Sequence, residues 1–173
     1  LKRSFLENIN SIKDIIQQQQ FRLKVNIINI IDARTIEFQP DPQNPRFRFL
    51  KPREKLKMVG VKLFNKNSKH ETERLFAYLQ HDYVEFLLRN RNDIKIEFQR
   101  LSNGQLSKDI HQQFKGFIFL NNNRLFQIMA LKNGIFAGHY RPPFKNEYQS
   151  LFRQAEKRAQ QNKAGYYGFP PKE

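Results

Sequence analysis

The sequence predicts an α+β fold in which a closed barrel of five strands carries about three packed helices. In Phe21 to Gln39, apolar and polar residues alternate on both sides of a short polar break, which is typical of a half-buried hairpin. Ile94 to Phe98 alternates in the same way, whereas apolar residues in Glu71 to Leu88 recur at helical spacing. The strands are expected to close into a barrel, because so few antiparallel strands in an open sheet would leave their edges exposed.

The composition predicts one basic domain. The chain has 173 residues, and its 31 Lys and Arg against 16 Asp and Glu give a net charge of +15. These charges are spread along the chain, which favours a folded basic face and a polyanionic partner such as nucleic acid, anionic lipid or an acidic protein surface. The absence of cysteine excludes a disulfide framework and a thiolate metal site. No apolar run is long enough to span a bilayer. The chain begins at Leu1 without Met, as a processed or truncated product would.

An amphipathic helix is expected before the barrel, over Ser4 to Gln19. Ser4 and Glu7 form a capping box, and an apolar stripe follows at helical spacing, made of Phe5, Ile9, Ile12 and Ile16. Residues 1–20 are therefore expected to be an extension outside the barrel domain.

Two more strands are expected after the hairpin. The proline-rich segment Pro40 to Pro45 predicts a loop. Arg46 to Leu50 alternates arginine with phenylalanine, so we expect a strand with its rings in the core and with Arg46 and Arg48 in water. Outward rings that stack on bases are the alternative. Leu56 to Val61 predicts a further strand, bent at Gly60.

The second half predicts three helices and two strands. The stripe of the Glu71 to Leu88 helix is expected to be Leu75, Leu79, Val84, Leu87 and Leu88. Strands are expected over Ile94 to Phe98 and Phe117 to Leu120. Leu125 to Asn133 predicts a helix closed by Gly134. The last helix, Lys145 to Lys163, carries a stripe of Tyr148, Leu151, Phe152, Ala155 and Ala159, and ends at Gly165. Together these elements predict an OB-type barrel with packed helices.

Five weak motifs, in the right order and spacing, resemble the staphylococcal nuclease family over residues 21–168, which leaves 169–173 as a tail. Ile31 to Thr35 resembles the family's I-D-G-D-T, and Leu56 to Val61 resembles R-L-x-G-I-D. Ile94 to Phe98 resembles the strand before the family's flexible loop. Phe126 to Ile135 resembles V-N-x-x-L-V-x-x-G-L, and Ala155 to Tyr167 resembles A-E-x-x-A followed by G-I-W.

The resemblance implies a site that this chain has lost. The family holds calcium with carboxylates, activates water with another carboxylate and binds phosphate with two arginines, chemistry that suits a hard cation and a charged oxyanion. In the first motif Asp32 keeps the first acidic position and Thr35 is retained, but Arg34 occupies the position of a metal ligand.

The later motifs depart further. Lys57 stands where the first arginine belongs, Lys62 replaces the second aspartate ligand, and Asn65 falls near the general base. The second arginine falls on Phe114 or Lys115, depending on a one-residue shift. Bases in place of acids oppose a divalent cation, so no metal, no cofactor and no phosphodiester hydrolysis by the family route are expected.

Other catalytic patterns are weak in this sequence. The four histidines share no metal-binding spacing, and no Gly-rich nucleotide loop is present. The residues expected to bind an anion or a partner are Arg46, Arg48, Lys57, Lys62, Lys115 and Arg141.

The expected function is that of a non-catalytic, nuclease-like accessory subunit that binds other protein subunits in a large assembly. Degenerate relatives of this kind are interaction modules, some of them at mitochondrial inner membranes, so the resemblance implies a mitochondrial, membrane-associated location and anionic lipid as a further partner. No small-molecule substrate is expected. One alternative is a basic module that binds RNA or DNA without cleavage. The other is an active phosphodiesterase with a rearranged site.

Overall fold

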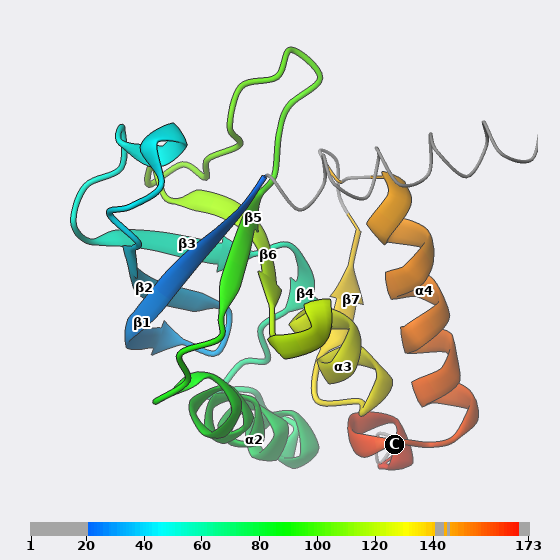
Figure 1. Cartoon of the computed structure of the whole chain (residues 1–173). Coiled ribbons are helices and arrows are strands. Elements are labelled where there is room, and N and C mark those ends of the chain that lie inside the picture. Colours follow the sequence, from blue (N-terminus) through cyan, green and yellow to red (C-terminus); the bar gives the residue numbers. More distant parts are fainter. Residues whose placement is uncertain (1–20, 141–143, 145, 170–173) are drawn as a thin grey trace, which may run out of the picture.

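The computed structural model describes residues 21–140, 144 and 146–169. Figure 1 shows a β-barrel with one helix, α2 (Glu71–Leu88), below it and two more, α3 (Phe126–Lys132) and α4 (Asn146–Gln161), to one side. The helix predicted over Ser4 to Gln19, Arg141 and residues 170–173 lie outside the described residues.

The barrel is made of five strands: β1 (Arg22–Asp32), β2 (Thr35–Pro40), β3 (Glu54–Met58), β5 (Lys95–Phe98) and β6 (Phe114–Phe119). Their order is β1-β2-β3-β6-β5, and β5 pairs with β1 to close the barrel. The β3–β6 pair is parallel and the others are antiparallel. The described part of the chain is thus a mixed five-stranded barrel with three α-helices, consistent with an OB-like fold.

The predicted hairpin is confirmed, with Ala33 and Arg34 as its turn. Leu23 and Val25 are buried, as the alternation predicts. Phe21, in contrast, precedes the strand and is exposed. A register shift between Ile27 and Asn29 then interrupts the alternation, because a bulge places an extra residue opposite the partner strand.

The strand predicted over Leu56 to Val61 is divided between two sheets. Its first half belongs to β3, and its second half is β4 (Gly60–Lys62), which pairs with β7 (Ala137–His139), a strand that the sequence analysis missed. Gly60 has φ +83° and lies against the Phe152 ring, so a Cβ atom there would be 2.5 Å from that ring. Glycine therefore permits both the predicted bend and the close packing of α4.

The prediction of a strand over Arg46 to Leu50 is wrong. Pro45 begins a 3₁₀ turn, η1 (Pro45–Phe47), and the Asn44 side chain accepts a hydrogen bond from the Arg46 backbone N–H. A proline with fixed φ behind an asparagine cap favours a helical turn over an extended strand. As a result Phe47 is buried, with its ring 6.0 Å from that of Phe98, whereas Phe49 is 59% exposed.

The three helices have nearly the predicted bounds, but the predicted stripes are partly wrong. In α2 the buried side chains are Phe76, Ala77, Gln80, Val84 and Leu88. Leu75 and Leu79 face outward instead, as does Leu151 in α4. The predicted α2 stripe combined residues from two faces of the helix, and the packing of Phe76 against Phe64 and Tyr166 selects one of them.

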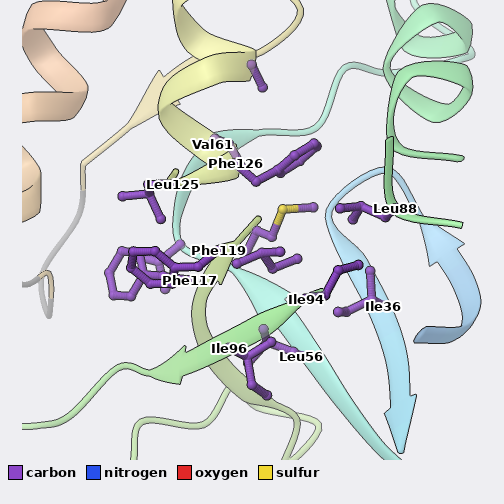
Figure 2. Close-up of a cluster of buried hydrophobic side chains, with 14 of the residues drawn as sticks. Ile36, Leu56, Val61, Leu88, Ile94, Ile96, Phe117, Phe119, Leu125 and Phe126 are labelled. Carbon is purple, nitrogen blue, oxygen red and sulfur yellow. The ribbon is translucent and has the colours of Figure 1, made fainter. Parts of the chain in front are cut away.

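The core joins the barrel interior to the helices. Figure 2 shows Ile36, Leu56, Ile94 and Ile96, which come from the barrel or its edge, in one cluster with side chains such as Leu88 of α2. Short 3₁₀ turns, η2 (Asn121–Asn123) and η3 (Gly165–Gly168), connect β6 to α3 and follow α4. Gly134 has φ +65° after the end of α3, as predicted for a residue that terminates a helix.

Candidate functional site

The strand register places four of the predicted residues in one row across the barrel. Asp32 pairs with Thr35, Thr35 pairs with Lys57, and Lys57 pairs with Lys115. Directly opposite residues on neighbouring strands have Cβ atoms about 5 Å apart, so this register brings together side chains that are distant in the sequence.

The turn at one end of the row is held by its own polar groups. The Asp32 carboxylate accepts a hydrogen bond of 2.8 Å from the Arg34 backbone N–H, and the Arg34 carbonyl accepts one of 2.8 Å from Met58. Thr35 is buried. The Nε atom of Arg34 is also buried and has no hydrogen-bond partner within the described residues. The half-buried Arg34 side chain therefore contributes a positive charge at this end of the barrel.

A carboxylate that the sequence analysis missed lies against the row. Asp109 Oδ2 is 3.6 Å from Lys57 Nζ, and the Asp109 side chain is only 9% exposed. Its other oxygen, Oδ1, accepts backbone hydrogen bonds from His111 and Gln113, both at 2.9 Å. Asp109 thereby fixes the turn that precedes β6 and places its charge beside Lys57. An aspartate that begins a tight polar turn was the available sequence signal.

We call Arg34, Lys57, Lys115 and Asp109 the cationic cluster. Burial lowers the pKa of the Lys115 ammonium, and the positive charges of Lys57 and Arg34 lower it further, while Asp109 partly opposes them. Burial by itself would raise the pKa of Asp109, but the Gln113 and His111 N–H groups and Lys57 outweigh it, so that pKa is lowered. The cluster therefore holds three cations against one ionised carboxylate.

This arrangement suits an anion and does not suit a divalent metal. A hard cation needs several oxygen ligands, whereas here the carboxylate is already engaged by a lysine and two backbone N–H groups. In the part of the chain that the structure describes, no group of three or more His, Asp or Glu side chains could hold a metal ion.

The other predicted site residues lie elsewhere. Lys62 is on β4, exposed, and its charge acts on Glu73 at the start of α2. The Asn65 backbone N–H donates to Glu73 Oε1 at 3.2 Å, so Asn65 belongs to the same region. Arg46 and Arg48 lie at the exposed η1 turn.

The sequence left open whether Phe114 or Lys115 takes the position of the second arginine. In the structure Lys115, and not Phe114, belongs to the cationic cluster. Phe114 is buried in the barrel, 4.9 Å from the Phe98 ring. Since neighbouring residues of a strand face opposite sides, Lys115 points away from that core.

A second polar cluster, made of Glu156, Tyr140 and Tyr167, ties α4 to the chain on either side of it. Both tyrosine hydroxyls donate to the Glu156 carboxylate, that of Tyr167 at 2.9 Å. A Cβ atom on Gly138 would overlap the Glu156 carboxylate and the Tyr140 hydroxyl. Burial, and then the Glu156 charge, raise the pKa of both tyrosines. These contacts make the cluster a structural link between β7, α4 and η3.

A scan against protein-family models and a search of curated proteins both find no match for the chain. Within residues 21–140, 144 and 146–169, no helix combines the length and the apolar character needed to cross a membrane.

Replacing Asp109 with alanine is expected to lower the free energy of unfolding by about 2 kcal/mol at neutral pH, because two backbone N–H groups lose their acceptor and Lys57 loses its ion-pair partner. Asp109→Asn keeps an oxygen for those N–H groups and should cost less. The pKa of Asp109 is lower in the folded chain than its ordinary value of 3.8. The ionised carboxylate therefore stabilises the fold fully at pH values above 3.8, and this stabilisation is lost as the pH falls through the folded-state pKa.

Urea unfolding at neutral and acidic pH measures this effect. Asp41→Ala is the matched control, because the Asp41 side chain accepts one backbone hydrogen bond in a more open loop. Equal stability of wild type and Asp109→Ala at neutral pH would show that the loop contact contributes nothing.

Proposed function

We propose that this chain is a non-catalytic, nuclease-like barrel that acts as an accessory subunit and binds other protein subunits in a large assembly. The observation that carries the proposal is the sign of the charge in the cationic cluster. Arg34 stands where the resemblance to the staphylococcal nuclease family implies a metal ligand, and it lies near Lys57 and Lys115. A site with bases where the resemblance implies acids supports binding in place of hydrolysis.

The barrel topology supports the proposal at a coarser level. An OB-like barrel presents a surface across its strands, and such folds serve many functions through the residues on that surface. Here the row ends in the two ammonium groups of Lys57 and Lys115, near the half-buried side chain of Arg34, and these cations match carboxylates of a partner protein better than a neutral surface does. The mitochondrial, membrane-associated location stays part of the proposal through the family resemblance.

Two measurements on the full chain test the proposal. The tagged chain, extracted in mild detergent and run on a native gel, should migrate in an assembly far above its own 20.8 kDa. The purified chain should not cleave DNA or RNA in calcium, and calorimetry should detect no calcium binding. Migration as a monomer in the native extract would contradict the accessory role, and calcium-dependent cleavage would contradict the absence of catalysis.

Nucleic-acid binding without cleavage is the second candidate, favoured by the same cluster. Three cations against one carboxylate, in a chain of net charge +15, give a surface that attracts phosphate. Anisotropy with a labelled oligonucleotide distinguishes the two functions. Affinity that falls steeply with salt and weakens in Lys57→Glu would favour nucleic acid, whereas no binding at low salt would remove this candidate.

A further inference from the structure

The outward face of α2 is apolar, although the helix packs against the barrel on its other side. We call Leu75, Tyr78, Leu79, Asp82 and Phe86 the α2 outer face. Leu75 is 48% exposed, Tyr78 58%, Leu79 38% and Phe86 84%. An exposed patch of large apolar side chains on one helix is typical of an interaction surface.

The spacing of this face indicates the shape of the partner. Residues 75, 79, 82 and 86 follow one another at intervals of four, three and four, which is the spacing of a coiled-coil seam. Side chains at these positions form the knobs and holes that receive the side chains of a second helix. A helical partner therefore fits this face better than an extended strand does.

The charge of the helix is opposite to that of the chain. The α2 segment contains four carboxylates and one arginine, a net charge of −3, in a protein of net charge +15. Glu85 is paired with Arg89 and Glu73 accepts the Asn65 backbone N–H, which leaves Glu71 and Asp82. Asp82 lies within the seam with 80% of its side chain exposed, and Glu71 is exposed at the start of the helix. A partner that neutralises these groups must carry lysine or arginine.

The basic groups near the face are already engaged. Arg74 donates to the carbonyl groups of Ser68 and Lys69. Arg89 forms an ion pair of 3.0 Å with Glu85, and the ammonium group of Lys66 lies 5.8 Å from the centre of the Tyr78 ring. These bases border the α2 outer face, and in the described part of the chain the nearest basic side-chain nitrogen to Asp82 is His81 Nδ1, 4.0 Å from Asp82 Oδ1.

This charge pattern selects among the occupants. A second copy that docked its α2 outer face against the same face in a two-fold dimer would offer no basic residue of that face to Asp82. An anionic membrane would repel the same carboxylate. A basic helix with an apolar seam can pack against the Leu and Phe side chains and form an ion pair with Asp82.

We infer that the α2 outer face binds an amphipathic helix of a partner protein whose apolar seam is flanked by lysine or arginine. This inference rests on the proposed function as a binding module and names one contact surface and the chemistry of its partner.

The test uses a labelled helical peptide of leucine and lysine, about two heptads long, and a counterpart with glutamate in place of lysine. By anisotropy, the wild-type full chain should bind the leucine–lysine peptide at least about tenfold more tightly than the leucine–glutamate peptide. Non-specific attraction predicts the opposite order, because the whole chain is strongly basic. Equal affinities, or tighter binding of the glutamate peptide, would overturn the inference.

Two variants locate the binding site. Phe86→Ser should weaken binding of the leucine–lysine peptide by about tenfold or more, as loss of an exposed aromatic anchor does. Asp82→Lys should abolish the preference for lysine over glutamate. Ile110→Ser is the matched control, since Ile110 is 90% exposed on the β5–β6 loop. A loss of affinity in Ile110→Ser as large as in Phe86→Ser would overturn the assignment to α2.

A photo-crosslinking residue at position 86 identifies what binds the α2 outer face. A native gel of a face variant then distinguishes failure of this inference from failure of the proposed function. Crosslinks to the leucine–lysine peptide support the inference, whereas crosslinks to a second copy or to residues 1–20 of the same chain overturn it. If the chain with Leu75→Ser and Phe86→Ser stays in the assembly as wild type does, the α2 outer face is not the binding surface, and the accessory role stands. A wild-type chain that runs as a monomer overturns the accessory role itself.

Discussion

Raising the pH from about 10 to about 11 is expected to remove about 3 kcal/mol of folding free energy, because three tyrosines have raised pKa values in the folded chain. Burial, and then the Glu156 charge, raise the pKa of Tyr140 and Tyr167. Burial, and then the Glu97 charge, raise that of Tyr148, whose hydroxyl is 2.6 Å from Glu97 Oε2. Below the ordinary value of 10.0 these hydroxyls are protonated in both states, and their contribution to stability is complete.

Above pH 10 the unfolded chain loses these protons while the folded chain keeps them, so stability falls until the folded-state pKa is reached. Tyr83, whose pKa burial also raises, acts in the same direction, and Lys115, whose pKa is lowered, acts in the opposite one. A pH titration followed by tyrosinate absorbance and far-ultraviolet circular dichroism measures the effect. The chain has no tryptophan, so the absorbance reports on tyrosine alone.

Tyr167→Phe and Tyr140→Phe provide the control for alkaline unfolding. Each removes one titrating hydroxyl and should make the loss of stability with pH less steep by about a third. If all tyrosines titrate near pH 10 while the circular dichroism stays unchanged, the three hydroxyls are not protected in the fold.

Replacing Gln127 with leucine is expected to lower the free energy of unfolding by about 3 kcal/mol. Gln127 is fully buried in α3, and its Oε1 accepts a hydrogen bond of 3.1 Å from the Ile118 backbone N–H. Its Nε2 donates to the carbonyl groups of Gly116 at 3.0 Å and Val59 at 3.4 Å. Leucine is similar in volume, so the cost comes from leaving the Ile118 N–H buried without an acceptor.

Urea unfolding measures this loss, and hydrogen exchange assigns it, because the Ile118 amide should lose protection more than other β6 amides. Gln154→Leu, on the exposed side of α4, is the matched control and should change stability by less than about 0.5 kcal/mol. An unchanged urea midpoint for Gln127→Leu would mean that the amide does not hold α3 to the barrel.

The sequence predicted most of the barrel because its local patterns agree with the final packing. The strand predicted over Ile94 to Phe98 matches β5 to within one residue, the strand predicted over Phe117 to Leu120 overlaps β6, which begins three residues earlier, and α2 has the predicted bounds. Gly60 and Gly134 both occupy the left-handed conformations expected at a bend and a helix end. Where the turn residues opposed the alternation, at Pro45, the turn residues prevailed.

The same patterns could not select the buried face of α2. Leu75 and Leu79 are as apolar as Val84 and Leu88, but only one of the two faces meets Phe64 and Tyr166. Which face of a helix is covered depends on elements far away in the sequence, so helical spacing by itself leaves both faces open.

By itself the sequence determined that the chain is strongly basic and that its basic residues, Arg34 and Lys62 among them, are spread along it. Only the tertiary structure decided which of the basic residues gather. The register of β2, β3 and β6 brings Lys57 and Lys115 side by side, while Lys62 lies on another sheet near Glu73. The tertiary structure also places Asp109 beside Lys57. Strand pairing and loop closure determine this distance, and neither can be read from composition or residue spacing.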